Sequence, residues 1–262
     1  MTGKFERLLS ILKEMQSVLV AFSGGVDSTF LLRAVRESGI RHLAVTAFSE
    51  TMPESELKFA GEMARLIGAE HRVIRTAELD NPDFAGNPRD RCFYCKDELF
   101  SRLSGISSAE GYRFVADGSN CDDLSDWRPG RQACKKHGVR SPLLEAGLSK
   151  AEIRELSKAM GLPTWAKPAA PCLSSRLPYG MEITRDALKR IERSEEFLKS
   201  LGFGELRVRS HGDIARIEVP EREFTRFSEK AVREAVAGRL KEYGFKYVAV
   251  DLEGFRSGRL NE

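Results

Sequence analysis

The sequence predicts an α/β fold in which a parallel sheet carries helices on both faces, followed by a smaller α+β domain. Three observations lead to this prediction. Strand-like and helix-like segments alternate through the first part of the chain, a glycine-rich turn joins the first strand to the next helix, and the order of elements changes beyond a proline-rich loop. A chain of 262 residues is long enough for one large domain and a smaller one.

Apolar runs and helix-start signals mark the elements of the first part. A helix-like run at 29–35 follows the first strand, and Thr51-Met52-Pro53-Glu54 indicates a capping box for a second helix that ends at Gly68. The expected strands are 18–22, 43–48, 72–75 and 112–116. Because helices separate these strands, we expect a parallel sheet that binds ligands at the carboxyl ends of its strands.

The second part begins after a stiff loop. A capping box, Ser149-Lys150-Ala151-Glu152, opens a helix through Met160, and the proline-rich segment 167–178 excludes a helix. We expect the domain boundary near Gly180, with domains at 1–180 and 181–262. The elements expected beyond it are a helix at 184–201, strands at 206–210 and 215–219, a further helix and a strand at 246–252.

Composition excludes several classes of protein. The hydrophobic content of 41% and charged content of 31% are ordinary for a globular protein, and no apolar run approaches the ~18 residues of a membrane span. With no signal peptide pattern at the N-terminus, we expect a cytoplasmic protein without a membrane partner. A net charge of +3 permits a nucleotide ligand without demanding a nucleic acid, and five cysteines in such a chain favour thiol, metal or redox roles over disulfides.

The turn Ser23-Gly24-Gly25-Val26-Asp27-Ser28 predicts an anion site. Its paired glycines let backbone N–H groups turn inward, and the next helix presents its positive end to the same point. The spacing matches neither a Walker-type phosphate loop nor a dinucleotide fingerprint. A helix terminus contributes only about 0.3–1 kcal/mol to an exposed anion. We therefore expect Mg²⁺ as well, with Asp27 the nearest acidic group; the alternative is a plain strand-to-helix corner.

This turn resembles the S-G-G-x-D-S pyrophosphate loop of the PP-loop ATP pyrophosphatases. All six residues follow a hydrophobic strand, as that motif requires. The resemblance implies an enzyme that binds ATP, adenylates a substrate and releases pyrophosphate.

Cys92-Phe93-Tyr94-Cys95 places two thiols where one metal or cluster can be held. The flanking Arg91 and Lys96 favour the thiolate forms. The pair suits half of a zinc site, a redox dithiol or two ligands of an iron–sulfur cluster. The chain has no second C-x-x-C; Cys121 and Cys134 could complete a zinc site, although we interpret both as small buried residues.

Cys172 lies on the proline-rich loop, which predicts a positioned nucleophile or ligand. Three thiolates leave one iron of a [4Fe–4S] cluster open for an exchangeable sulfide. Such an arrangement suits sulfur delivery to an adenylated substrate.

Motifs along nearly the whole chain resemble the LarE-type sulfurtransferases. They are Asp117-Gly118-Ser119-Asn120-Cys121-Asp122-Asp123, Arg128-Pro129-Gly130, Ser141-Pro142-Leu143, Lys167-Pro168, Pro171-Cys172-Leu173-Ser174-Ser175-Arg176 and Arg207-Val208-Arg209. The resemblance implies adenylation of a carboxylate of pyridinium-3,5-biscarboxylic acid mononucleotide and its conversion to a thiocarboxylate, for a nickel-pincer nucleotide cofactor. Some members of the family sacrifice one cysteine, which becomes dehydroalanine, and others hold a [4Fe–4S] cluster with three. Cys172 matches the donor, and Cys92 and Cys95 place this chain in the cluster-bearing group.

The resemblance also implies roles for single residues. Phe48 would hold the adenine, unless it is a core aromatic, and Arg207 and Arg209 share one face of a strand that suits a substrate phosphate or carboxylate, unless they are plain surface arginines. The residues assigned to ATP and Mg²⁺ are Ser23, Gly24, Gly25, Asp27, Ser28, Gly118, Asp122 and Asp123. The acidic pair Asp122 and Asp123 could instead be a solvated turn. By the same resemblance the protein forms a homo-oligomer, a hexamer.

Two other functions compete with this one. Some PP-loop enzymes that thiolate tRNA also combine three cysteines with a cluster, but this chain shows no basic stripe or additional zinc module. A nucleotide- or metal-binding sensor without catalysis is the other alternative, and the intact loop together with Cys172 argues against it.

Overall fold

A computed structural model describes residues 3–124 and 129–256, and the chain divides into two compact units. The first consists of Met1–Asn81 and Arg89–Ala170, and the second of Pro82–Pro88 and Pro171–Glu262. This division falls earlier than Gly180, and the domain boundary stays a prediction. The segment Pro82–Pro88 belongs with the second unit because buried Asn87 donates from Nδ2 to the Pro178 carbonyl at 2.8 Å, and its own carbonyl accepts from Gly180 N at 2.9 Å.

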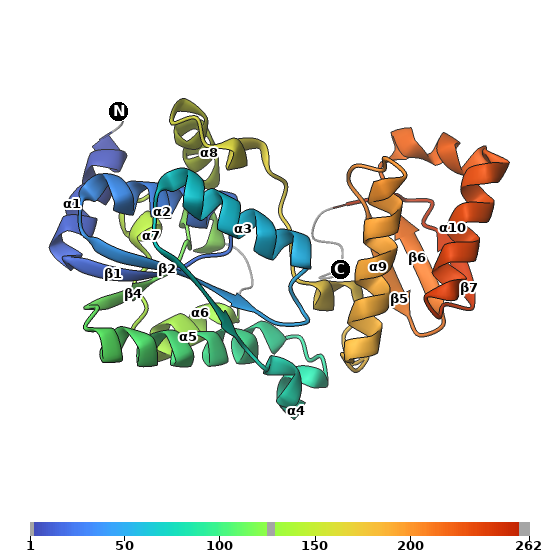
Figure 1. Cartoon of the computed structure of the whole chain (residues 1–262), viewed down its shortest axis with the longest axis horizontal. Helices are drawn as coiled ribbons and strands as arrows, with labels where there is room; N and C mark the ends of the chain where they lie inside the picture. Colours follow the sequence, from blue (N-terminus) through green and yellow to red (C-terminus); the bar gives the residue numbers. More distant parts are fainter. Residues whose placement is uncertain (1–2, 125–128, 257–262) are drawn as a thin grey trace. The chain divides into compact units, whose positions relative to one another are not determined.

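The first unit contains a four-stranded parallel sheet, which confirms the predicted fold class (Figure 1). The strand order is β3-β2-β1-β4, so the first strand lies between the second and the fourth. The bounds are β1 Ser17–Ala21, β2 Arg41–Phe48, β3 His71–Arg75 and β4 Phe114–Ala116. The carboxyl ends of all four strands therefore lie at one edge of the sheet, where such folds bind ligands.

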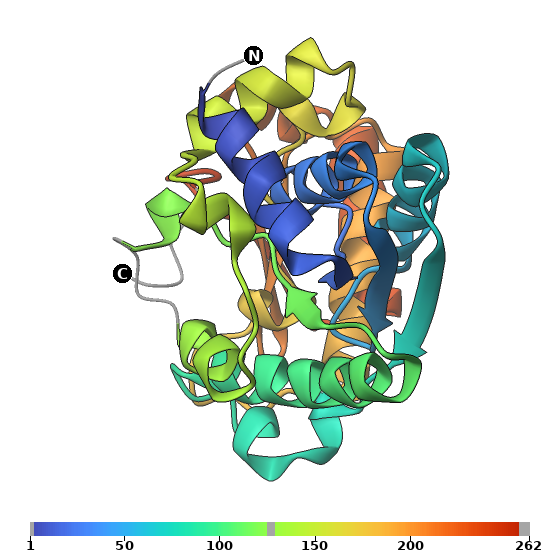
Figure 2. The same cartoon turned by 90° about the vertical axis from the view of Figure 1, so that its left-hand side faces the viewer.

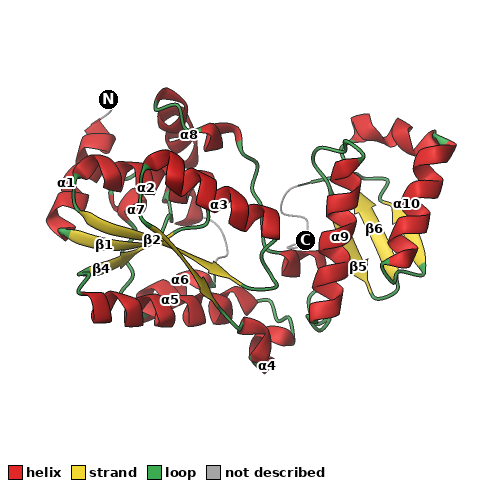
Figure 3. Cartoon of the chain, viewed as in Figure 1, coloured by secondary structure: helices red, strands yellow, loops and turns green. Residues whose placement is uncertain are grey.

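Helices cover both faces of this sheet, as Figures 2 and 3 show. Alternate side chains of β1 enter different cores: Val18 and Val20 pack with helices α1, α2, α3, α7 and α8, whereas Leu19 packs with α5 and α6. The helix bounds are α1 Gly3–Met15, α2 Val26–Ser38, α3 Glu54–Ile67, α5 Arg91–Glu110, α6 Gly130–Lys136, α7 Pro142–Glu145 and α8 Lys150–Ala159.

One helix-start prediction is confirmed and one is wrong. Ser149 and Glu152 form the expected capping box at the start of α8. Helix α3, however, is capped by Pro53 and receives no side-chain cap from Thr51. The Thr51 hydroxyl is buried and donates to Glu78 Oε1 at 2.8 Å instead, because that buried carboxylate needs donors.

The second unit is a small α+β unit around a three-stranded sheet, as predicted. Strand β5 runs antiparallel to β6, and β6 runs parallel to β7. Its elements are α4 Pro82–Ala85, α9 Arg185–Ser200, β5 Arg207–His211, β6 Ile214–Glu218, α10 Lys230–Glu242 and β7 Tyr247–Val250. Val208, Ala215 and Ile217 pack on one face of the sheet in a core with α9 and α10.

Short 3₁₀ helices complete the described chain. Their bounds are η1 Glu78–Asp80, η2 Cys121–Leu124, η3 Pro163–Ala166, η4 Leu173–Arg176 and η5 Glu221–Ser228. The expectation that 167–178 contains no helix is wrong for η4, which fits between Pro171 and Pro178 because that stretch has no proline of its own. Among the helices that the structure describes, none combines the length and apolarity needed to cross a membrane.

Candidate active site

The glycine-rich turn connects β1 to α2 at the carboxyl edge of the sheet. Helix α2 begins at Val26, and no side chain caps its start at Gly25. The hydroxyl oxygens of Ser23 and Ser28 lie 3.1 Å apart, and Gly25 N donates to Ser23 Oγ at 3.4 Å. The turn therefore combines the positive end of a helix with two hydroxyls, the features that a phosphate group needs.

Two glycines allow the backbone to approach closely around this turn. Gly24 has a φ of +69°, and a Cβ there would lie 2.8 Å from the Cα of Ala60 on α3. A Cβ on Gly118, just after β4, would lie 3.0 Å from the backbone nitrogen of Ser28. Neither position has room for a side chain.

A cavity of about 280 Å³ opens beside the turn. Of the residues that the sequence assigned to ATP, those lining the cavity are Ser23, Gly25, Asp27, Ser28, Gly118 and Asp123. Gly24, Asp122 and Phe48 do not line it. Residues that sequence reasoning missed also line it, and they are Ala21, Phe22, Val45, Thr46, Ala47, Met52, Lys96, Leu99, Phe100, Asp117 and Ser119. Their apolar members form a wall suited to a nucleobase.

Phe48 ends β2 outside this wall. The guanidinium carbon of Arg75 lies 5.9 Å from the centre of its ring. Thr46, two residues earlier, lines the cavity and donates from its hydroxyl to the carbonyl of Phe22 at 2.7 Å. The cavity thus meets β2 at Val45–Ala47, and a role for Phe48 in holding the adenine stays a prediction.

Asp27 lies in the first turn of α2 with polar partners on both carboxylate oxygens. Asn120 Nδ2 donates to Oδ1 at 3.3 Å, and Lys150 Nζ forms an ion pair with Oδ2. Lys150 is the first residue of α8. The sequence marked Lys150 within a capping box but gave no sign that its side chain reaches the turn.

The acidic pair after β4 supports the backbone of its own turn. Asp123 is buried, and its Oδ2 accepts from Asn120 N at 3.0 Å. Exposed Asp122 accepts a hydrogen bond from the backbone nitrogen of Lys150 at the start of α8. Of the two, Asp123 alone lines the cavity, and Asp122 alone is hydrogen-bonded to the start of α8.

A second lysine also contacts the turn. Lys167 Nζ pairs with Glu56 Oε2 at 2.8 Å, lies 3.6 Å from the ring centre of Phe59, and lies 3.5 Å from the carbonyl oxygen of Gly24. Its side chain is only 15% exposed. The Lys167-Pro168 motif therefore anchors the turn to α3, a role that the sequence did not indicate.

Cys134 is buried on α6 and donates from Sγ to Asp117 Oδ2 at 3.4 Å. Burial, and then the negative charge of Asp117, raise the pKa of this thiol to about 12. The arrangement supports the interpretation of Cys134 as a small buried residue. The same interpretation is wrong for Cys121, which is partly exposed.

Cys134 should therefore resist alkylation in the folded protein. A thiol reacts as its thiolate, and at pH 8 a group with a pKa near 12 is almost entirely protonated. Mass spectrometry after iodoacetamide treatment of protein freed of metal should find Cys134 modified only once the protein is unfolded in urea, whereas exposed Cys92 reacts in both states. Equal modification of Cys134 in the folded and unfolded protein would contradict this burial.

Cys92 and Cys95 lie in the first two turns of α5, three residues apart and so on the same side of the helix. The next residue, Lys96, lines the cavity, so the thiol pair and the cavity share one helix. Within residues 3–124 and 129–256, no group of three or more His, Cys, Asp or Glu side chains is arranged to hold a metal ion. Cys172 belongs to the second unit, and a site shared by all three thiols stays a prediction.

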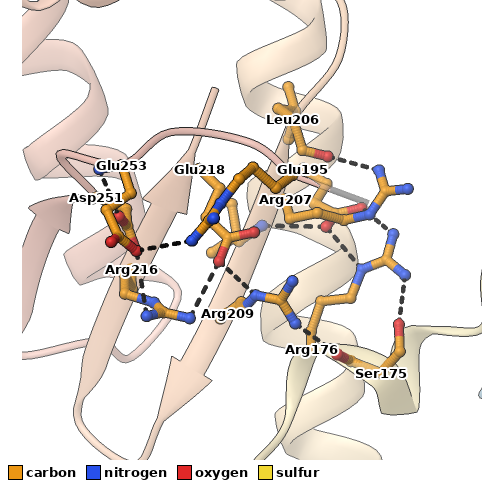
Figure 4. Close-up of polar contacts among 12 residues, drawn as sticks. Ser175, Arg176, Glu195, Leu206, Arg207, Arg209, Arg216, Glu218, Asp251 and Glu253 are labelled. Atoms are coloured by element: carbon orange, nitrogen blue, oxygen red, sulfur yellow. Dashed lines mark hydrogen bonds and ion pairs between the residues drawn. The ribbon is translucent and has the colours of Figure 1, made fainter. Parts of the chain in front are cut away.

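The loop that carries Cys172 is fixed by a buried ion pair (Figure 4). Arg176 pairs with Glu195 of α9 through two hydrogen bonds, at 2.9 and 3.0 Å, and both side chains are almost fully buried. Nη1 of Arg176 donates to the carbonyl of Cys172 at 3.1 Å, and the backbone nitrogen of Ser175 donates to the same oxygen at 3.0 Å. These two hydrogen bonds support the main chain at Cys172, and its role as a positioned nucleophile or ligand stays a prediction.

Removing Glu195 should destabilise this loop and the unit around it. Glu195→Ala leaves the guanidinium of Arg176 buried without its carboxylate, which costs about 3–5 kcal/mol. Urea denaturation would measure the loss. Glu196→Ala, at the exposed neighbouring position of the same helix, is the control and should change stability by less than about 0.5 kcal/mol. Similar losses for both variants would show that the ion pair does not stabilise the fold.

Arg207 and Arg209 lie on β5 beside this ion pair and are not solvated surface arginines (Figure 4). Arg209 is buried, donates to Glu218 Oε1 at 2.6 Å and reaches the Ser175 carbonyl at 3.0 Å. Burial, and then the positive charge of Arg176, lower the pKa of Arg207 to about 10. The carboxylates of Glu195 and Glu218 offset part of the repulsion among the guanidinium groups. Arg128, from another family motif, lies outside the described residues.

Similarity to single known proteins assigns the chain to a family, although no family model matches it. It is 39% identical to the pyridinium-3,5-bisthiocarboxylic acid mononucleotide synthase of Lactiplantibacillus plantarum, over 97% of this chain and 92% of that protein. It is 44% identical to an uncharacterized protein of Synechocystis, over 99% and 97% of the two chains. A GMP synthase of Thermus thermophilus is 27% identical over 70% of this chain and 40% of its own length.

The parallel sheet, the glycine-rich turn and the likeness to GMP synthase define an enzyme with the PP-loop fold. Within that class, the chain belongs to the LarE family, the family of the pyridinium-3,5-bisthiocarboxylic acid mononucleotide synthase.

Proposed function

We propose that this protein is an ATP-dependent sulfurtransferase that adenylates a carboxylate of pyridinium-3,5-biscarboxylic acid mononucleotide and replaces the adenylate with sulfur. The observation that carries the proposal is the cavity at the carboxyl edge of the sheet, lined by the uncapped start of α2 and the hydroxyls of Ser23 and Ser28. The similar synthase of Lactiplantibacillus plantarum is named for its product, a bisthiocarboxylic acid mononucleotide. The corresponding biscarboxylic acid is therefore the substrate that we propose.

In the proposed first step, ATP lies with its base against the apolar wall and its phosphates at the turn. A carboxylate oxygen of the substrate attacks the α-phosphorus, the bond between the α-phosphorus and the bridging oxygen breaks, and its electron pair leaves with pyrophosphate. Backbone N–H groups in the first turn of α2, which no side chain caps, and the two serine hydroxyls would stabilise the charge that develops on the leaving group.

The residues at the turn fit a magnesium ion that arrives with ATP. Mg²⁺ is usually held by one or two carboxylates together with substrate phosphates and water, not by a cage of protein ligands. Asp27 supplies a carboxylate in the cavity lining and Asp123 lies in the same lining. Bound there, Mg²⁺ would neutralise phosphate charge.

Arg207 and Arg209 would bind the phosphate or a carboxylate of the substrate. Both come from one strand, and Arg209 is linked through the Ser175 carbonyl to the loop of Cys172. A planar guanidinium suits two-point recognition of such groups.

In the second step, sulfur displaces AMP from the activated acid. If Cys172 is the donor, its thiolate attacks the acyl carbon and AMP leaves; loss of the Cα proton then breaks the Cβ–S bond and gives the thiocarboxylate and dehydroalanine. If Cys92, Cys95 and Cys172 hold a [4Fe–4S] cluster, they would act as its thiolate ligands, and the bound cluster would supply a sulfide in place of the cysteine sulfur.

Two measurements test the proposal. Incubation with ATP, Mg²⁺ and the biscarboxylate mononucleotide should release pyrophosphate in proportion to acyl-adenylate formed, and no release with any candidate acid would favour the sensor instead. Anaerobic purification followed by iron and sulfide analysis and an absorption spectrum separates the two sulfur sources: iron with broad absorbance indicates a cluster, and a mass loss at Cys172 after turnover indicates sacrifice.

The remaining parts of the proposal concern the setting of the enzyme. We expect a cytoplasmic homo-oligomer, a hexamer as the family resemblance implies, whose partner is a small nucleotide-like molecule. Nucleic acid is not an expected partner, and RNA capture with a steep dependence on salt would revive the tRNA-thiolation alternative.

A further inference from the structure

We propose that Lys150 is an internal counter-ion of Asp27, which Mg²⁺ displaces when MgATP binds, so that the ammonium group then turns to the nucleotide phosphates. The inference rests on the proposed use of MgATP. It names a residue with no role in the functional assignment so far.

Lys150 is held beside Asp27 from its backbone and from its side chain. As the first residue of α8, it follows a complete capping box, and its backbone nitrogen donates to a carboxylate oxygen of Asp122. Its ammonium group pairs with Asp27 Oδ2, while Asn120 Nδ2 occupies Oδ1 at 3.3 Å. The side chain therefore begins at a fixed point and ends at one oxygen of the carboxylate.

The charges explain why a lysine is useful there. A positive side chain in the first turn of a helix is unfavourable, because the helix presents its positive end there. The negative charge of Asp27 stabilises the start of α2. Because Asp27 also lines the cavity, the same charge repels an incoming phosphate. Pairing with Lys150 cancels that negative charge and offsets the unfavourable placement of the lysine.

Mg²⁺ and Lys150 compete for the same oxygen atom. Asp27 Oδ2 accepts a hydrogen bond from the ammonium group of Lys150. A metal ion can coordinate this oxygen only after the ammonium group has moved away. The lysine side chain is 36% exposed, so its flexible stem is free to move. Once displaced beside the turn, the ammonium adds a positive charge to the site of the leaving pyrophosphate.

The test measures metal and nucleotide separately. Mn²⁺ binding to the nucleotide-free protein, followed by electron paramagnetic resonance, should be about two- to fivefold tighter in Lys150→Met than in the unchanged protein, as expected for loss of a partly exposed ion pair. The KM for MgATP in pyrophosphate release should instead rise about tenfold, because a charged contact to phosphate is lost. A residue that only supports the fold would not move these two affinities in opposite directions.

Matched variants make the result decisive. Lys4 of α1 forms an ion pair at 2.7 Å with Glu152, which like Lys150 lies in α8. Lys4→Met therefore removes an ion pair from α8 without touching Asp27, and it should leave Mn²⁺ binding unchanged. Lys150→Arg keeps the positive charge, so its affinities for Mn²⁺ and MgATP should stay close to those of the unchanged protein. Lys150→Gln removes the charge but keeps a polar side chain, and it should behave like Lys150→Met. In an Asp27→Asn background, Lys150→Met should have no effect on Mn²⁺.

The proposal is overturned if Mn²⁺ affinity is the same in the unchanged protein, Lys150→Met and Lys150→Gln. It is equally overturned if neither variant folds, since Lys150 would then be a structural residue. Failure of the proposed function looks different: pyrophosphate release would be absent from the unchanged protein, while the Mn²⁺ measurements would still give their answer.

Discussion

Replacing Cys172 with alanine should abolish sulfur transfer and leave pyrophosphate release within about twofold of the unchanged protein. The thiol is the atom proposed to attack the activated acid or to bind the cluster, and no other group supplies its chemistry, so we expect a loss of at least about 10³-fold, as for removal of a nucleophile. The turn and cavity belong to the first unit and Cys172 to the second, so the change leaves the ATP site intact. Thiocarboxylate would be measured by mass spectrometry and pyrophosphate by a coupled assay.

Cys121→Ala is the matched control for this experiment. Cys121 starts η2 beside the acidic turn, and its backbone nitrogen, not its thiol, makes the hydrogen bond to the Leu148 carbonyl at 3.0 Å. Both activities should survive in that variant. Thiocarboxylate formation by Cys172→Ala at the unchanged rate would exclude Cys172 as donor and as an essential ligand.

The sheet was predictable from the sequence because its strands are buried on both faces. Val18, Leu19 and Val20 are all inaccessible to solvent and enter two different cores, which requires an unbroken apolar run. Helix α5 was not predicted, although Phe100, Leu103 and Ser107 recur at helical spacing and Gly111 ends the helix with a φ of +69°.

The turn was equally predictable, because its glycines and hydroxyls are adjacent in sequence. The lysines around it were not. Lys96, Lys150 and Lys167 come from three separate segments, and only the packing of those segments brings their side chains to the cavity or the turn. The same holds for Glu195, whose position on an amphipathic helix gave no sign that it pairs with Arg176. Local patterns predict backbone features, whereas ion pairs between distant residues depend on the tertiary fold.

Gly24→Ala should remove most ATP-dependent activity, with a fall of about 10²–10³-fold in pyrophosphate release and a loss of roughly 2–4 kcal/mol in stability. Two costs combine. A left-handed backbone costs a residue with a side chain about 1–2 kcal/mol, and the added Cβ would lie 2.8 Å from a backbone atom of α3, so the turn or the helix must shift. A shift of the turn moves the N–H groups and hydroxyls away from the phosphates, and catalysis depends steeply on such placement.

Gly39→Ala separates these two costs. Gly39 ends the same helix, α2, with a φ of +75°, but a Cβ there meets nothing within 4 Å. This variant should therefore lose only the backbone contribution to stability and keep pyrophosphate release unchanged. Equal losses of activity in the two variants would mean that global stability, and not the close contact between Gly24 and Ala60, controls the reaction. Activity lost at Gly24 alone would show that the shape of the turn itself positions the nucleotide.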